Sequence, residues 1–506
     1  MTAFIVAFGL PGQYNCLAPL SAAVGFSVIF YFMAEIKERK KAFFLAFFWF
    51  FSVSLIQLNW LSQTAYHGIY ILLVYVGLSL FCALQFALLS LVLNRLTLWN
   101  SLAAAAFWTL LEWSRYFVFC GFAFAPFGIP FSSNAVTRQI ASLMGILGLS
   151  FLVVLTSAFS AVAYKTKRKK EIFSFIGVLL FPYLVGGALF LKRSNAMKAS
   201  NQTFSALLIQ TGLKPEEKMP LAAGEPFVSP YWQWLRVLHA IEENHEKVDL
   251  MVLPESTFPY GAKLALFPPA LITPFLPVFE TKDSLLTNLD IAKSLAKRYS
   301  CDLILGLDDF DEKGSYNAAF YVSEDSKVER YEKQKLVPLA EYLPLSILDS
   351  IVARYGIHSF FSHGREATIF HGRKRYGPSI CFEECFSALI RRFKNNGAEI
   401  LVNLTNDAYF PCTKLPAQHY ELGRLRSVEL GLPLLRSCNN GVTAGVDSLG
   451  RKIASIDEEW ELKALLVKLP LFSYTTLYSI FGHLPLILFS FGILLLFFLV
   501  KKSRER

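Results

Sequence analysis

Three segments of the sequence carry side chains that together could perform nucleophilic catalysis. Cys381 ends the β-type run 375–380 and opens a helical run, so its thiol is expected at a strand-to-helix turn, where backbone N–H groups can help form the thiolate. Glu255 ends the apolar strand predicted at 249–254 and can accept a proton. Lys333 can stabilise an oxyanion as a positive charge. Glu, Lys and Cys in this order predict an acyl-transfer enzyme whose base is not histidine.

Two more acidic residues could support this set. Glu341 could hold Lys333 in place or orient the carboxylate base, although it could instead cap a turn or pair with a surface arginine. Glu383, two residues past the thiol, could position the loop. The amine could also belong to Lys335, but the spacing to the Leu-Val-Pro run at 336–338 favours Lys333.

Simpler structural explanations exist for each candidate. A lone cysteine in an apolar strand is usually a core residue, but a strand end followed by two acidic residues is a poor core position for Cys381. A Pro-Glu pair after a strand, as at Glu255, is often a surface turn. The catalytic interpretation therefore depends on the three residues occurring together.

The cysteines and histidines show no arrangement typical of a metal site. Cys381 and Cys385 form a Cys-x3-Cys pair without a second pair, and the eight histidines are scattered. We therefore expect no metal site.

The composition predicts a membrane protein with a sizeable soluble part. The chain has 506 residues, of which 54% are hydrophobic and 17% are charged, and it contains 47 Phe. The net charge of +10 does not require a nucleic-acid partner, because much of it lies in short clusters beside apolar spans. Membrane-spanning helices are predicted at 17–35, 42–60, 69–94, 98–119, 139–164, 172–191 and 474–500.

Basic residues indicate how these spans are oriented. Clusters follow the spans that end at 35, 94, 164 and 500, and with six helices before residue 192 and one at the end, all four lie on one side. By the positive-inside rule that side is the cytoplasm, so residues 193–470 are expected on the periplasmic face of a bacterial inner membrane. The apolar stretch 2–10 is short for a span, and the number of spans is left at seven or eight.

Residues 193–470 have the texture of a layered α/β domain. Strands are predicted at 204–210, 249–254, 302–307, 317–322, 375–380, 399–404 and 443–446, and helices at 231–245, 285–299, 386–396 and 417–430. Residues 212–230 and 257–283 are Pro-rich and are expected to be irregular lids. The predicted domains are a transmembrane domain at 1–192, a catalytic domain at 193–470, and a last helix with a basic cytoplasmic tail at 471–506.

The Glu-Lys-Cys set resembles the nitrilase superfamily, which has an α-β-β-α sandwich. With membrane helices on both sides, the chain resembles the apolipoprotein N-acyltransferase family over nearly its whole length. The motifs that carry this resemblance are Leu58-Asn59-Trp60, Glu112-Trp113-Ser114-Arg115, Gly121-Phe122, Leu253-Pro254-Glu255-Ser256, Tyr331-x-Lys333-x-x-Leu336-Val337-Pro338-x-x-Glu341, Cys381-x-Glu383, Asn406-Asp407-Ala408-Tyr409-Phe410 and Leu434-Leu435-Arg436-Ser437-x-Asn439-Asn440-Gly441.

The resemblance implies a two-step reaction. Glu255 would be the general base, Lys333 the oxyanion stabiliser and Cys381 the nucleophile, with Glu341 and Glu383 as further important acids. Cys381 would take an acyl chain from the sn-1 position of a phospholipid and pass it to the amine of the diacylglyceryl-cysteine of an apolipoprotein. No cofactor is needed because a phospholipid ester is already activated, and nothing requires more than a monomer.

Two departures from the family concern substrate placement. Phe382 stands where the family usually has Tyr after the nucleophile, and the family's Trp is missing near 214–216, where Trp232 or Trp234 could serve instead. Three other positions are possible contacts. Asn406 is expected in a loop beside the site, and Glu112 and Arg115 could meet lipid headgroups or pair with each other to lock helices.

Two rival functions remain open on the sequence alone. A membrane-tethered nitrilase-like amidase would send the acyl-enzyme to water, but one anchor would suffice for it. A membrane scaffold with an inactive domain would not need an intact Glu255, Lys333 and Cys381.

Overall fold

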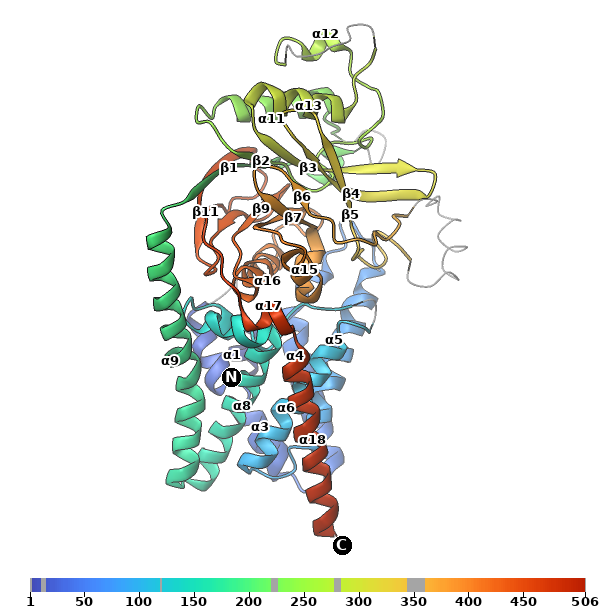
Figure 1. Ribbon diagram of the computed structural model, residues 1–506. Coiled ribbons are helices and arrows are strands. Elements are labelled where there is room, and N and C mark those ends of the chain that lie inside the picture. The colour runs from blue at the N-terminus through green and yellow to red at the C-terminus, as the bar shows by residue number, and fades with distance from the viewer. Residues whose placement is uncertain are drawn as a thin grey trace. The chain divides into compact units, whose positions relative to one another are not determined.

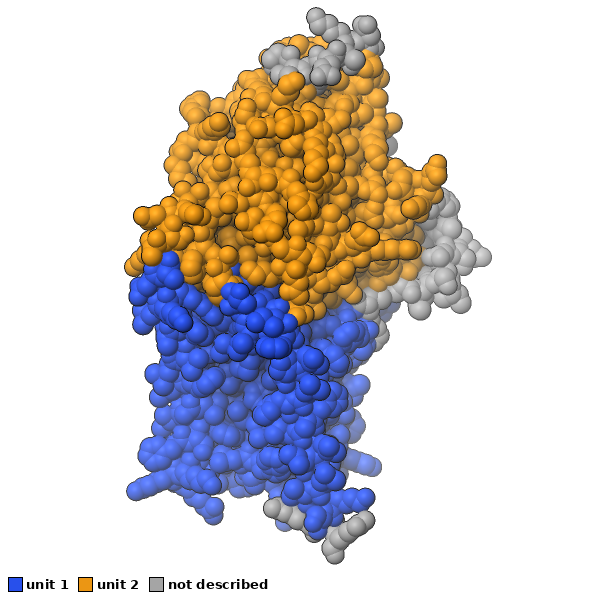
Figure 2. Space-filling model, in the orientation of Figure 1, with its two compact units in different colours: residues 1–196, 410–431, 475–506 blue, residues 197–409, 432–474 orange. Residues whose placement is uncertain are grey.

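The chain folds into two compact units (Figure 2). Unit 1 comprises residues 1–196, 410–431 and 475–506, and unit 2 comprises residues 197–409 and 432–474. The computed structural model describes residues 2–10, 15–118, 121–219, 226–276, 284–343 and 360–505, so parts of the two expected lids lie outside the described residues. The chain passes from unit 1 to unit 2 and back twice, because the segment 410–431 groups with unit 1.

Unit 1 is helical (Figure 1). Its helices are α1 Thr2–Phe8, α2 Ala18–Val24, α3 Ser27–Glu35, α4 Arg39–Gln57, α5 Ile71–Leu88, α6 Leu98–Ser114, α7 Ile129–Ser132, α8 Ala141–Thr166, α9 Lys169–Ser200, α16 Leu415–Leu430, α17 Leu477–Phe481 and α18 Leu484–Glu505. Six stretches of the described chain are long and apolar enough to cross a membrane, namely 18–35, 39–57, 71–91, 137–166, 169–200 and 484–503.

Two expected spans differ from this set. The span predicted at 98–119 is the helix α6, which has 17 residues and is shorter than the other six. The apolar stretch 2–10 forms the seven-residue α1, which at 1.5 Å per residue is only about 10 Å long and cannot cross a hydrocarbon core of about 30 Å.

Basic clusters lie at one end of the helices of unit 1. The C-terminus and the junction between α8 and α9 lie at the same end of unit 1 (Figure 1). Lys165 at the end of α8 forms an ion pair with Glu35 at the end of α3, so the junction between α3 and α4 lies there too. The basic residues after α3, after α8 and at the end of α18 therefore lie at one end of unit 1.

Unit 2 contains two six-stranded mixed sheets. The first has the order β12-β1-β2-β3-β4-β5 and the second β11-β10-β9-β8-β7-β6. The strands are β1 Thr203–Gln210, β2 Leu250–Val252, β3 Asp302–Asp311, β4 Gly314–Val322, β5 Val328–Glu332, β6 Phe370–His371, β7 Arg375–Ile380, β8 Ile400–Thr405, β9 Leu434–Cys438, β10 Thr443–Val446, β11 Lys452–Ile456 and β12 Lys463–Pro470.

The two sheets pack face to face, with helices outside them. Strand β1 contacts β9, and β4 contacts β7 across the sandwich. The helices α11 Pro230–Glu242 and α13 Asn288–Tyr299 cover the first sheet, and α15 Ser387–Asn395 packs on β7 (Figure 1). The shorter helices are α10 Pro215–Lys218 and α12 Pro269–Ile272. The predicted α-β-β-α sandwich is confirmed.

The middle of each sheet is parallel, and this arrangement positions the chemistry. Strands β1, β2 and β3 are parallel neighbours, as are β7, β8 and β9. All residues of β2 and β8 are buried, as expected for strands covered on both faces. Glu255 follows the carboxyl end of β2, and Cys381 follows the carboxyl end of β7. Each residue therefore lies at the edge of its sheet where parallel α/β folds bind ligands.

Candidate active site

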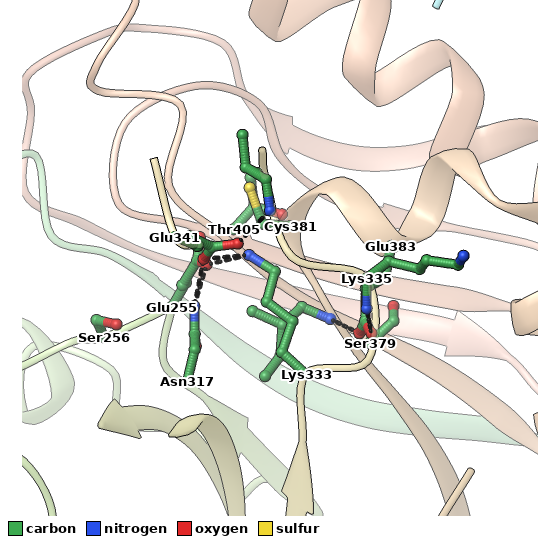
Figure 3. Close-up of polar contacts among 12 residues, drawn as sticks. Glu255, Ser256, Asn317, Lys333, Lys335, Glu341, Ser379, Cys381, Glu383 and Thr405 are labelled. Carbon is green, nitrogen blue, oxygen red and sulfur yellow. Dashed lines mark hydrogen bonds and ion pairs between the residues drawn. The ribbon is translucent and has the colours of Figure 1, made fainter. Parts of the chain in front are cut away.

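Glu255, Lys333 and Glu341 form one ionic cluster, in which Glu255 and Lys333 are buried and Glu341 is partly exposed (Figure 3). The Lys333 Nζ lies 2.8 Å from Glu255 Oε1 and 2.8 Å from Glu341 Oε1. Lys333 is 1% exposed and Glu255 6%, so water does not screen these contacts. The structure thus brings the proposed base, the proposed oxyanion stabiliser and one supporting acid together, and Glu341 lies on the lysine rather than on a surface arginine.

A residue that the sequence did not single out completes this cluster. Asn317 in β4 donates from Nδ2 to Glu255 Oε1 at 2.7 Å and to Glu341 Oε1 at 2.9 Å. Its carbonyl accepts the Lys333 N–H at 2.9 Å, which continues the strand pairing past the end of β5. Asn317 therefore fixes both carboxylates and the lysine backbone.

The cluster carries one positive charge for two carboxylates. Burial alone lowers the pKa of Lys333, but Glu255 and Glu341 more than offset burial and raise that pKa well above its usual range. The amine is consequently a permanent cation at neutral pH. A fixed cation that needs no reorganisation is what an oxyanion requires.

Cys381 lies beside this cluster, at the start of a 3-10 turn that runs from Cys381 to Cys385 (Figure 3). Its backbone φ of +51° is in the left-handed region, which a residue with a Cβ adopts only when its surroundings hold it there. Burial and the Glu255 carboxylate raise the pKa of the Cys381 thiol, and Lys333 only partly opposes them. The Cys381 side chain is therefore a thiol at neutral pH, and as a nucleophile it would need a base to take its proton.

Left-handed residues also occur in the other two turns of the site. Ser256, directly after Glu255, has φ +40°, and Leu339, two residues before Glu341, has φ +67°. Neither is glycine, so each turn is held in its conformation at a cost of about 1–3 kcal/mol. Such conformations are concentrated at sites where side-chain geometry matters more than local stability.

Glu383 connects the turn that begins at Cys381 (the nucleophile turn, residues 381–385) to the segment that contains Lys333. Its Oε1 accepts the backbone N–H groups of Gln334 at 2.6 Å and Lys335 at 3.1 Å, and its Oε2 accepts that of Ile380 at 2.8 Å. The buried Tyr331 hydroxyl also donates to this carboxylate at 2.8 Å. One side chain thereby connects the end of β7, directly before Cys381, to the segment directly after β5, which contains Lys333.

Replacing Glu383 with glutamine should loosen this connection. The amide nitrogen that replaces one carboxylate oxygen would face N–H or O–H donors, which costs about 1–3 kcal/mol of folding free energy. We expect acylation of Cys381 to slow by about 10- to 100-fold, because small misplacements of reacting groups have effects of that size. Mass spectrometry of the acylated protein and thermal unfolding in detergent would measure both effects. Glu366→Gln, the same change at an exposed position, is the control and should leave both unchanged.

Comparisons with known proteins place the chain in a family. The model described as "Carbon-nitrogen hydrolase" matches residues 229–477, and that described as "Apolipoprotein N-acyltransferase N-terminal domain" matches residues 4–159. The apolipoprotein N-acyltransferase of Chlamydia pneumoniae is 30% identical over 96% of this chain and 94% of its own length. The chain belongs to the apolipoprotein N-acyltransferase family. Together with its apolar helices, this membership makes it an integral membrane protein.

A more distant curated relative and one solved structure are also similar to this chain. The apolipoprotein N-acyltransferase of Shewanella oneidensis is 27% identical over 85% of this chain and 80% of its own length. Among solved structures, a CN-hydrolase superfamily protein from Xanthomonas campestris is 17% identical with a TM-score of 0.38, covering 57% of this chain and 97% of that one.

The two departures from the family sequence have different structural settings. Phe382 is 9% exposed and packs edge-on against Phe386, with ring centroids 4.8 Å apart, so its ring is part of the nucleophile turn. Trp234 is fully buried, stacks on Phe258 and donates to Asn288, which makes it a core residue. Trp232 is 58% exposed, so of the two alternatives only Trp232 has a surface available for substrate.

The other predicted contacts each have a partner within the protein, although Glu112 Oε2 and Arg115 Nη2 make no hydrogen bond to the described residues. Asn406 Oδ1 accepts from Asn439 at 3.0 Å, which places it in the loop next to β9. Glu112 and Arg115 are each 3% exposed; Glu112 accepts the Phe127 N–H at 2.9 Å, and Arg115 donates to Gln85 at 2.6 Å. These contacts join α6 to other parts of unit 1 and give no support to headgroup binding.

A second buried network behind the nucleophile was not foreseen from the sequence. The fully buried Arg436 in β9 lies 2.9 Å from Glu384 in the nucleophile turn and 3.3 Å from Asp407 in the loop after β8. A buried arginine must be paired, and the strand that contains Arg436 was not among the predicted strands, so the sequence carried no signal for this network. Arg436 thereby links three segments that converge on Cys381.

Proposed function

We propose that this protein transfers a fatty acyl chain from a phospholipid to the N-terminal amine of the diacylglyceryl-cysteine of an apolipoprotein, through a thioester on Cys381. The observation that carries the proposal is the buried Lys333 amine, 2.8 Å from Glu255, beside a thiol that is protonated at rest. Family membership supports the reaction class. The apolar spans support a reaction between two amphiphilic substrates.

In the first half-reaction the Cys381 sulfur attacks the ester carbonyl carbon of the phospholipid. Glu255 takes the thiol proton as the sulfur–carbon bond forms, and the Lys333 amine stabilises the oxyanion. The intermediate collapses when the carbon–oxygen bond to the glycerol breaks. Glu255 returns the proton to the leaving alkoxide, and a lysophospholipid departs.

In the second half-reaction the amine of the acceptor attacks the thioester. Glu255 takes a proton from the attacking nitrogen, Lys333 again faces the oxyanion, and the carbon–sulfur bond breaks. The proton passes to the sulfur and restores the thiol. The product is an amide, and the donor position is expected to be sn-1.

We further propose where this reaction occurs and which part of the chain performs it. The basic clusters at one end of unit 1 support a cytoplasmic location for that end, and hence a catalytic domain on the periplasmic face of the inner membrane. Residues 193–470 would form this domain, with transmembrane helices before and after it. Unit 2 contains Glu255, Lys333 and Cys381, so a single subunit supplies the whole set.

A two-stage experiment tests the proposal against the amidase alternative. The full-length protein in detergent is mixed with a defined diacyl phospholipid, and mass spectrometry should find one acyl chain on Cys381. A diacylglyceryl peptide is then added and should discharge the adduct to an amide. Discharge to free fatty acid in the presence of the peptide would indicate an amidase, and a folded protein without any adduct would contradict the thioester mechanism.

A further inference from the structure

A second buried lysine lies behind the proposed base, on an element that the mechanism does not use. Lys218 ends the short helix α10 and is 7% exposed. Its Nζ donates to the main-chain carbonyl oxygen of Glu255 at 3.2 Å. The Glu255 carboxylate meets Lys333, so two amines from different segments hold the carbonyl and the carboxylate of one residue.

The backbone of Lys218 is itself anchored. The buried side chain of Gln233, from α11, donates to the Lys218 carbonyl at 3.0 Å and to that of Val228 at 2.7 Å. Lys218 therefore does not reach Glu255 from a loose surface loop. Its amine is presented from a fixed point on the first sheet's helical layer.

The turn that Lys218 holds needs support. Ser256 has φ +40° and donates through Oγ to Asp308 at 2.8 Å. The turn lies directly on Gly306 of β3, where an added Cβ would be 2.6 Å from the Pro254 oxygen and 2.7 Å from the Glu255 Cα. A strained turn in such close contact keeps its geometry only if its polar groups are held from several sides.

Lys218 also differs electrically from Lys333. Burial lowers the pKa of Lys218 to about 8, although Glu255, Asp308 and Cys438, the groups that face it, partly oppose burial. The Asp308 pKa is in turn raised by burial. The Lys218 amine is charged at neutral pH and loses its proton in mildly alkaline solution. The Lys333 amine keeps its proton there because its pKa is raised.

We propose that Lys218 is a positioning residue for the general base, which holds the strained turn through the Glu255 carbonyl and places a second positive charge next to that residue. The proposal rests on the proposed function, because it assumes that Glu255 is the base. A charged Lys218 stabilises the ionised carboxylate and so weakens it as a base. A neutral Lys218 still donates to the carbonyl but no longer restrains proton uptake.

The rate of Cys381 acylation as a function of pH tests this role. In the full-length wild type with a defined diacyl phospholipid, we expect the rate to step upward near pH 8. Lys218→Met, which keeps the length but removes the donor and the charge, should lose that step and acylate about 10- to 100-fold more slowly at pH 7. Lys214→Met, the same change at an exposed position one helical turn away, should retain both the step and the rate.

Each outcome decides the matter. A wild-type profile without a step near pH 8 overturns the proposal, as does a Lys218→Met profile that matches the wild type. If Lys218→Met does not fold, Lys218→Arg decides, because it keeps the donor and a charge that does not titrate. It should acylate Cys381 without the step, and a retained step would contradict the proposal. A wild type that forms no adduct at any pH contradicts the proposed function itself and is thereby distinguishable.

Discussion

With Cys381 replaced by alanine, acyl transfer is expected to fall by about 10⁴-fold or more, because the proposed thioester forms on this thiol. Alanine keeps a Cβ in the same left-handed backbone, so the strain at φ +51° is unchanged. The hydrogen bonds of Glu383 and the ion pairs of Lys333 do not involve the thiol. The thermal unfolding midpoint in detergent should therefore remain at the wild-type value while the acyl adduct disappears.

The serine variant of Cys381 changes the reacting atom and keeps a side chain of similar size. Cys381→Ser keeps a hydroxyl in place, but Glu255 must then take a proton from a group that gives it up less readily than a thiol, so transfer should remain at least about 10³-fold slow. Cys16→Ala, at an exposed cysteine of unit 1, is the matched control and should retain full activity. Wild-type-like turnover by the alanine variant would mean that another residue carries the acyl chain.

The alternation of apolar strands with helices predicted a layered α/β domain, and the resemblance to the nitrilase superfamily predicted the sandwich. All seven predicted strands are present, but β5, β6, β9, β11 and β12 were not foreseen. Strand β9 contains Arg436, and β5 is short and charged, so neither has the apolar pattern of a buried strand. Each is specified by its partner strands, which a single sequence does not reveal.

The helix bounds were wrong where backbone geometry overrides hydropathy. The apolar run at 139–164 is α8, but Gly145 breaks it with φ +68°, and Glu429 of α16 accepts the Ile146 N–H at 2.8 Å. Helix α9 continues to Ser200, past the predicted end at 191, because the polar residues that follow contain no helix breaker. The predicted helix 417–430 is α16, which groups with unit 1 and not with the sandwich.

The candidate site could be named from the sequence for a chemical reason. A thiol, a carboxylate and an amine at strand ends are recognisable as types, so Glu255, Lys333 and Cys381 could be named from the sequence. Asn317 and Lys218 contact Glu255 from other elements, and their importance depends only on where the chain places them. A residue that positions another side chain through a hydrogen bond can be of many types, so its type does not reveal this role.

Lys333→Met is expected to have the second largest effect, for two combined reasons. Loss of an oxyanion donor costs about 10²–10³-fold in rate. In addition, Glu255 and Glu341 share the Asn317 amide, and two adjacent carboxylates without a cation cannot both remain ionised, so one takes up a proton. If Glu255 is protonated, base catalysis worth about 10²–10⁴-fold is lost as well. Acylation of Cys381 should become undetectable.

The same substitution should also destabilise the fold. Removing one partner of a buried ion pair typically costs about 3–5 kcal/mol. Since the folded-state pKa of Lys333 is raised, its stabilising contribution is fully present below the unfolded lysine pKa of about 10.4 and is lost only as pH rises through the folded value. The difference in unfolding midpoint between Lys333→Met and the wild type should therefore persist across the neutral range.

Two further variants test which lysine stabilises the oxyanion and why the loss of Lys333 destabilises the fold. Lys335→Met tests the alternative amine two residues away, whose Nζ lies 5.3 Å from the Phe386 ring, and it should keep most of the activity. Lys333→Met combined with Glu341→Gln removes one of the two carboxylates left without a cation, so it should regain part of the lost stability without regaining acyl transfer. Activity lost in Lys335→Met but kept in Lys333→Met would reassign the oxyanion stabiliser. Equal stability of the single and double variants would mean that two adjacent carboxylates without a cation do not destabilise the fold.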